Sequence, residues 1–320
     1  TVPNLLFGKT YYWRAAVKHA LDTSEWGPVW TFSTLDGVSN VSPANGSGGI
    51  HPQRTLDWGT VTGNQWYIYQ LDTTPDFNSP LFQTGHSSSN VSQVQVSNLL
   101  FGTTYYWRAA VKHALDTSGW GQTWSFTTID WVTNSFPSNG STGRYPRLDL
   151  DWGAVTGNQW YIYQLDTTPD FSSPHLQEGN SSPNVSEVEV ADLLFGATYY
   201  WRAAVKHAID TSSWGPTWSF TTIDWVNNVS PSNLSTGRPP SLTLDWGAVT
   251  GNFGYTYEVD TTPTFNSPHL LAGSSVPSSS EIAISNLLFG KTYYWRAAVK
   301  HALDTSEWGA VWSFTTIDWV

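Results

Sequence analysis

The sequence predicts an all-β fold, a linear array of tandem seven-stranded β-sandwiches. One segment, Tyr-Tyr-Trp-Arg-Ala-Ala-Val-Lys-His-Ala, begins at Tyr11, Tyr105, Tyr199 and Tyr293, a constant spacing of 94 residues. Within each repeat, apolar residues recur with a period of two, which is typical of half-buried strands. Runs of Gly, Pro, Asn and Ser separate these segments and mark turns. A spacing of 94 residues is too long for a solenoid repeat and fits a self-contained sandwich of about 100 residues.

The spacing divides the chain into three full modules, at residues 38–131, 132–225 and 226–320. Residues 1–37 match only the end of a module, so we expect them to be the C-terminal part of a truncated module from a longer array. Two strands alone are marginally stable in water.

In the first full module we expect seven strands and no helix. They span residues 38–41, 54–58, 66–71, 81–83, 94–96, 104–112 and 124–128. Tyr67 and Tyr69 recur in every module, whereas the alternate positions Trp66 and Ile68 become Gly and Thr in the third. A sandwich core tolerates such changes poorly. Tyr67 and Tyr69 are therefore expected to point inward, and Trp66 and Ile68 outward.

Each module also carries Leu-Leu-Phe-Gly-x-Thr-Tyr-Tyr-Trp-Arg-Ala-Ala, then a Ser-x-Trp-Gly loop and Trp-Ser-Phe-Thr-Thr. This half resembles the second half of a bacterial fibronectin type III domain, an Ig-like sandwich. Trp58 and the Tyr-x-Tyr at Tyr67 are similar to its first half. The resemblance implies that Tyr105 is the tyrosine corner. The segments Asp-Thr-Thr-Pro-Asp-Phe and Phe-Gly-Thr-Thr-Tyr-Tyr-Trp-Arg most resemble repeats of secreted Bacteroidota surface proteins, such as giant gliding-motility adhesins. Similar modules are spacers in secreted polysaccharide-degrading enzymes.

Composition narrows the possible functions. The net charge is −11, with only 14 Lys and Arg, whereas nucleic-acid binding needs clustered basic residues. No apolar run is long enough to span a membrane, and the absence of Cys excludes disulfides and thiolate metal sites. No catalytic motif is present, so we expect no enzyme.

We also expect no metal site or cofactor. Each repeat has one His in a loop, but no second ligand stands at metal-binding spacing, so a solvated or loop-packing role is favoured. Calcium at the module junctions is left open by a recurring aspartate, although one carboxylate per junction falls short of the six to eight oxygens that calcium takes. The residues concerned are His19, His113, His207 and His301, and Asp36, Asp130, Asp224 and Asp318.

Two sets of tryptophans are candidate interaction residues. The outward residues Trp66, Ile68, Trp160 and Ile162 form exposed apolar patches, which suit either a sugar face stacked on an indole or a contact between chains. Trp131, Trp225 and Trp319 stand at module boundaries and are expected to pack between neighbouring modules. The alternative is that each belongs wholly to the core of one module.

Two further features concern surface loops. Asp-Thr-Thr resembles an acceptor of Bacteroidota O-glycosylation, which would make the protein a glycoprotein modified at Thr73, Thr167 and Thr261. Outward-facing Arg108 is expected either to stack on Trp120 or to leave Trp120 as a simple cap on the core.

These observations predict a non-enzymatic extracellular repeat protein at the cell surface, forming a stalk or filament for adhesion. Its partners would be further copies of the module, other chains through self-association into filaments, and surface glycans or polysaccharides. The alternative is a set of carbohydrate-binding or spacer modules of a secreted polysaccharide-degrading enzyme.

Overall fold

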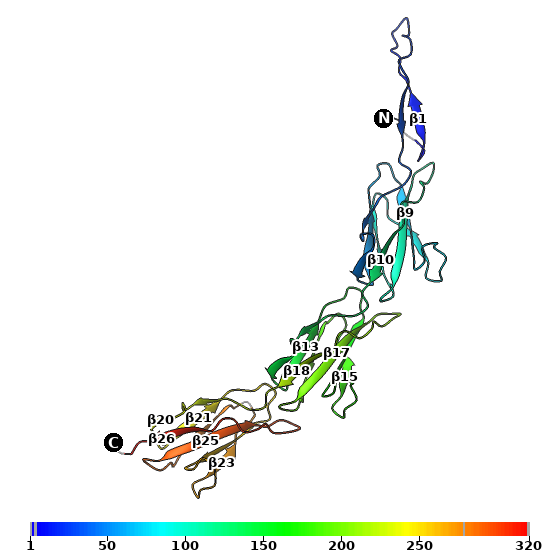
Figure 1. Ribbon diagram of the computed structural model, residues 1–320. Helices are drawn as coiled ribbons and strands as arrows, with labels where there is room; N and C mark the ends of the chain where they lie inside the picture. Colours follow the sequence, from blue (N-terminus) through cyan, green and yellow to red (C-terminus); the bar gives the residue numbers. More distant parts are fainter. Residues whose placement is uncertain (1, 3–4, 278, 319–320) are drawn as a thin grey trace. The chain divides into compact units, whose positions relative to one another are not determined.

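The computed structural model describes residue 2 and residues 5–277 and 279–318. Throughout this part the regular secondary structure is β-strand, with no helix (Figure 1). The predicted all-β fold of tandem sandwiches is therefore confirmed.

Each repeat contains the same succession of eight strands. Module 1, defined as residues 38–131, has β3 (Asn40–Ser42), β4 (Ser47–Ile50), β5 (Arg54–Trp58), β6 (Trp66–Asp72), β7 (Gln83–His86), β8 (Gln93–Val96), β9 (Thr104–Lys112) and β10 (Trp124–Thr128). Module 2, residues 132–225, has β11 (Asn134–Phe136), β12 (Ser141–Arg144), β13 (Leu148–Trp152), β14 (Trp160–Asp166), β15 (Gln177–Asn180), β16 (Glu187–Val190), β17 (Thr198–Lys206) and β18 (Trp218–Thr222). Module 3, residues 226–320, has β19 (Asn228–Ser230), β20 (Ser235–Arg238), β21 (Leu242–Trp246), β22 (Tyr255–Asp260), β23 (Leu271–Ser274), β24 (Glu281–Ile284), β25 (Thr292–Val299) and β26 (Trp312–Thr316). Residues 1–37, the terminal hairpin, contain β1 (Thr10–Trp13) and β2 (Trp30–Ser33).

The strands of a module form two sheets. In module 1 the orders are β3-β5-β8 and β4-β10-β9-β6-β7, and modules 2 and 3 repeat both. This arrangement agrees with a fibronectin type III-like sandwich.

The eighth strand is a difference from the seven expected. Ser47–Ile50 was assigned to a turn because it is rich in glycine, but it pairs in parallel with β10 at the edge of the larger sheet. Gly49 has φ of +70°, and the register shifts between the two pairs of residues. A glycine bulge therefore lets a sequence typical of a turn extend the sheet. Strand β7 also begins later than expected, at Gln83.

The core lies between the two sheets. In module 1, Trp58, Tyr67, Trp107 and Phe126 are all almost completely buried. Tyr67 therefore points inward as expected, and Tyr69 is half-buried and packs against this core. Ala110 stands two residues after the outward-facing Arg108 on β9 but is buried as well, since it is small and lies opposite Ile68 on the neighbouring strand.

The contacts of the chain divide it into two compact units. Unit 1 contains residues 1–132, 155–159 and 204–213, and unit 2 contains residues 133–154, 160–203 and 214–320. The loops 155–159 and 204–213 belong to unit 1 because they contact residues of module 1.

Candidate functional site

The joint between one module and the next is the first candidate site, because the same contact occurs three times. The backbone N–H of a phenylalanine donates to an aspartate of the following module, at 2.9 Å in each case. The phenylalanine ring also meets a histidine ring edge-on, with centroids 5.9–6.2 Å apart. The first joint contains Phe7, His113 and Asp116, the second Phe101, His207 and Asp210, and the third Phe195, His301 and Asp304. The first two joints lie within unit 1 and the third within unit 2.

The donating loop of each joint is held by its own module. The Leu100 N–H donates to the Tyr105 hydroxyl at 2.9 Å, which confirms the tyrosine corner. Gly102 has φ of +58°, and a Cβ built there would lie 2.8 Å from Oδ1 of Asp130. Only glycine fits under this carboxylate. Asp130 therefore packs against the loop, and the hydroxyl of Ser213 donates to it at 3.1 Å.

The accepting loop is a tight turn. The N–H of His207 donates to the Asp210 carbonyl at 2.9 Å, and the N–H of Thr211 donates to Oδ1 of Asp210 at 2.7 Å. Oδ2 of Asp210 is then directed to Phe101. One carboxylate therefore closes its own turn and binds the preceding module.

The histidines of these joints pack rather than point into solvent. His207 is 3% exposed. Burial lowers its pKa, and the charge of Asp210 partly offsets this effect. In the described part of the chain, the Nδ1 atoms of His113, His207 and His301 have no hydrogen-bond partner.

The tryptophans at the module boundaries were expected to pack between neighbouring modules, and for Trp131 and Trp225 this stays a prediction. Each is 53% exposed, whereas the next residue, Val132 or Val226, is 2% exposed. At each boundary the valine is therefore the buried residue and the tryptophan the more exposed one. Trp319 lies outside the described residues.

The outward face of the larger sheet is the second candidate site. Trp66 on β6 is 36% exposed, and its ring centroid lies 6.2 Å from that of His86 on β7. Ile68 is half-buried beside them. Module 2 places Trp160 and Ile162, both half-buried, at the equivalent positions.

An arginine on the same sheet is clamped between two rings. The guanidinium of Arg108 lies 4.9 Å from the Trp120 ring centroid and 4.1 Å from that of Phe77. Its Nε donates to Gln70 at 2.8 Å. Stacking on Trp120 was one of the two arrangements expected. The contact with Phe77 was not expected, because Phe77 has a positive φ of 55° that nothing in the sequence indicates.

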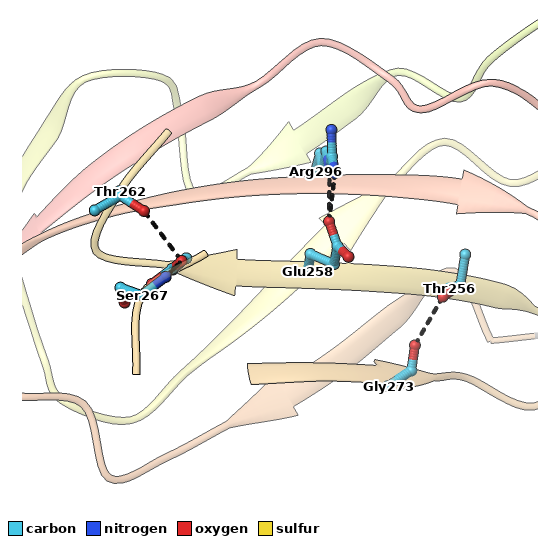
Figure 2. A network of polar contacts seen from close by, with 7 residues as sticks. Thr256, Glu258, Thr262, Ser267, Gly273 and Arg296 are labelled. Atoms are coloured by element: carbon cyan, nitrogen blue, oxygen red, sulfur yellow. Dashed lines mark hydrogen bonds and ion pairs between the residues drawn. The ribbon is translucent and has the colours of Figure 1, made fainter. Parts of the chain in front are cut away.

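Module 3 strengthens this clamp with a charge. Figure 2 shows Arg296 on β25 beside Glu258 on β22, joined by an ion pair of 2.6 Å. The arginine also lies over Phe265 and Trp308.

The predicted glycosylation sites lie in a loop organised by a buried aspartate. Asp72 accepts the backbone N–H groups of Thr73 and Ser79 and the hydroxyls of Thr74 and Ser79. Burial alone would raise the pKa of Asp72, but these hydrogen bonds outweigh it and hold the pKa below its ordinary value. The Thr73 hydroxyl donates to Ser79 at 3.1 Å. The equivalent hydroxyls of Thr167 and Thr261 bond Ser173 and Ser267. Glycosylation would break these bonds, and it stays a prediction.

The remaining features of the chain that bear on function concern metal ions and membranes. Over residues 5–277 and 279–318, no group of three or more His, Asp or Glu side chains is placed to hold a metal ion. Calcium at the junctions stays a prediction. The same residues include no helix long and apolar enough to cross a membrane.

Sequence reasoning missed the phenylalanine and aspartate of the joints. Their signal was present, since Phe7, Phe101, Phe195 and Phe289 and Asp22, Asp116, Asp210 and Asp304 all recur at the 94-residue spacing. The partners lie 109 residues apart, so no local pattern pairs them.

Comparison with known proteins adds little. No protein-family model and no curated protein sequence matches the chain. Among solved structures, the chain is similar to the FN1–FN3 domains of chicken CNTN1, at 15% identity and a TM-score of 0.27 over 85% of this chain and 98% of that one. The fold class therefore rests on the strands and sheets themselves.

Proposed function

We propose that this chain is a non-catalytic extracellular array, a stalk or filament that serves cell-surface adhesion. The observation that supports it is the repeated joint, because one Phe–Asp hydrogen bond and one Phe–His ring contact recur at every module boundary. A joint specified in each repeat is what a protein needs when its task is to hold modules in series.

Small-angle scattering of the full chain tests this proposal. Replacing Asp210 and Asp304 by Ala removes the acceptors of the second and third joints, and we expect a broader distance distribution. Asp22→Ala is the matched control, because Asp22 holds the same position in the terminal hairpin and is exposed, and its carboxylate accepts the backbone N–H of Thr23, the next residue. A distribution unchanged by the double substitution would contradict a role for the joints in ordering the array.

The adhesive part of the proposal needs its own measurement. The unaltered chain, coated on beads, is expected to hold them to a polysaccharide-coated surface under flow. Coated beads that detach like bare beads would overturn the adhesive role of this segment and leave only a spacer role.

Sugar binding is a second candidate, favoured by the exposed Trp66 with the His86 ring beside it. Sugar faces stack on exposed aromatic rings. Module 3 is an internal control, since it has Gly254 at this position. Binding of a soluble polysaccharide that Trp66→Ala with Trp160→Ala abolishes would support this function. Concentration-dependent self-association abolished by the same pair would instead indicate a contact between chains.

A further inference from the structure

The second and third joints share one framework but differ in their titratable side chains. In the second joint, Nδ1 of His51 accepts the backbone N–H of Thr156 at 3.0 Å, with the Thr156 hydroxyl at 3.1 Å. A ring nitrogen that accepts an N–H must be unprotonated. In module 2 the position of His51 is taken by Tyr145, so the third joint lacks this base.

The buried histidines of the two joints also have different neighbours. In the third joint, Nε2 of His301 lies 3.7 Å from Oδ1 of Asp192, so a carboxylate stands ready to pair with a protonated ring. The position equivalent to Asp192 in module 1 is Asn98, which is neutral. Both Asn98 and Asp192 have φ of +59°, so exchanging them leaves the backbone unstrained.

Other charged and titratable groups lie around these rings. At the second joint they include Asp210, which binds Phe101, Asp130, which accepts the Ser213 hydroxyl, and Arg54, whose charge acts on His51. At the third joint, Asp304 binds Phe195 and acts on the nearby Tyr199 hydroxyl. The His301 ring also meets Phe253, with centroids 5.7 Å apart.

We propose that the array contains joints of two kinds: an acid-labile second joint built on His51 and Asn98, and an acid-stable third joint built on Tyr145 and Asp192. Burial in the joint lowers the pKa of His207, so this ring is neutral when the second joint forms at neutral pH. In the third joint, Asp192 adds a carboxylate 3.7 Å from Nε2 of the His301 ring, whereas the second joint has the neutral Asn98 at that position.

The sign of the effect follows from proton binding. Burial lowers the pKa of His51 and of His207, and the Arg54 charge lowers that of His51 further. When the joint separates, the burial is relieved, and both pKa values rise toward the ordinary value of about 6.5. The separated state then binds more protons, so the second joint is stable at neutral pH and weakens as the pH falls below about 6.5.

Spin-label distances in the full chain test this. The chain has no cysteine, so introduced pairs are labelled uniquely. Thr104→Cys with Glu187→Cys spans the second joint, and Thr198→Cys with Glu281→Cys spans the third at matching positions. Between about pH 7.5 and about pH 5 we expect the separated fraction to rise at least about threefold at the second joint and to stay unchanged at the third.

Exchanging the two residue pairs is the control. His51→Tyr with Asn98→Asp is expected to make the second joint insensitive to acid, and Tyr145→His with Asp192→Asn to make the third joint acid-labile. The proposal is overturned if the second joint of the unaltered protein does not respond to acid. It is also overturned if neither exchange transfers the response.

Discussion

The terminal hairpin and the β9–β10 hairpin of module 1 have almost the same sequence but very different burial. Tyr11 pairs with Phe32 in the first and Tyr105 with Phe126 in the second, with ring centroids 5.7 and 5.9 Å apart. Yet Trp13 is 49% exposed, whereas its counterpart Trp107 is 0% exposed. Strand pairing is therefore a local property of this sequence. Burial is supplied by the half of a module that precedes the hairpin.

Strand length shows the same dependence. β9 spans nine residues and β1 only four. β9 also pairs with β6 along seven residues, and the hairpin has no counterpart of β6. The ring of Trp13 is tilted 41° to that of Trp30, whereas the equivalent pair in module 1 is edge-on at 85°. The two rings therefore adopt the edge-on arrangement only where the rest of the module packs against them.

The largest expected effect on stability comes from truncating Trp107, the buried counterpart of Trp13. Trp107→Ala should destabilise module 1 by about 3–5 kcal/mol, the usual cost of truncating a buried large aromatic residue. Trp13→Ala should change stability by about 0.5 kcal/mol or less, because its side chain is half-exposed. Native-state hydrogen exchange of the β9 and β1 amides resolves the two regions. Equal losses at the two sites would mean that the hairpin is packed in solution as a module is.

The next largest effect concerns the buried Asp72, which lies in the first half of module 1 and has no counterpart in the terminal hairpin. Asp72→Asn should destabilise module 1 by about 1–3 kcal/mol. The reason is that the NH₂ group of the new amide would face N–H and O–H groups that donate hydrogen bonds to the carboxylate. Since the pKa of Asp72 is lowered from 3.8 in the folded state, the unfolded chain binds the proton more readily. The contribution of Asp72 is therefore present above about pH 4 and is lost as the pH falls through the lowered pKa.

Acid unfolding followed by the exchange of module 1 amides tests this. The unaltered module should lose stability steeply below about pH 4, and the Asp72→Asn module less steeply. The amides of the terminal hairpin, which has no such aspartate, serve as the control. Parallel acid curves for the two proteins would contradict the role given to this carboxylate.

Much of the fold was predictable, because a module is specified by patterns within 94 residues. The period of two fixed the inward faces of β6 and β9, and repetition fixed the number of modules. β4 was missed because its four residues contain two glycines, which favour turns in isolation and form a strand only beside β10. The joints were missed for a related reason: Phe101 and Asp210 meet only once two modules are folded.

Removing the stacked arginine is expected to have a smaller effect on stability, and this effect should also differ between module 1 and the hairpin. Arg108 lies over both Phe77 and Trp120. Among the residues that the structure describes, Arg14 in the hairpin lies over one ring, that of Trp26, at 4.7 Å. Arg108→Gln should cost about 0.5–2 kcal/mol. Arg14→Gln should change stability by no more than about 0.5 kcal/mol. Chemical denaturation followed through the β9 amides measures the loss caused by Arg108→Gln. The β1 amides measure the loss caused by Arg14→Gln. A loss at Arg14 as large as that at Arg108 would show that the contact with Phe77 adds nothing.

The smallest expected effect is a gain in stability at a turn that every full module has and the hairpin lacks. Modules 1 and 2 have Gly46 and Gly140 at this turn, both with φ of +73°, whereas module 3 has Leu234 with φ of +63°. A leucine in this left-handed conformation costs about 1–2 kcal/mol, and at 77% exposure it buries little in return. Leu234→Gly removes that strain but loosens the unfolded chain, so we expect module 3 to gain only about 0.5 kcal/mol. Gly140→Leu should destabilise module 2 by at least as much, and thermal unfolding followed by module-resolved exchange measures both. If both substitutions shift stability in the same direction, backbone strain does not distinguish this turn between modules.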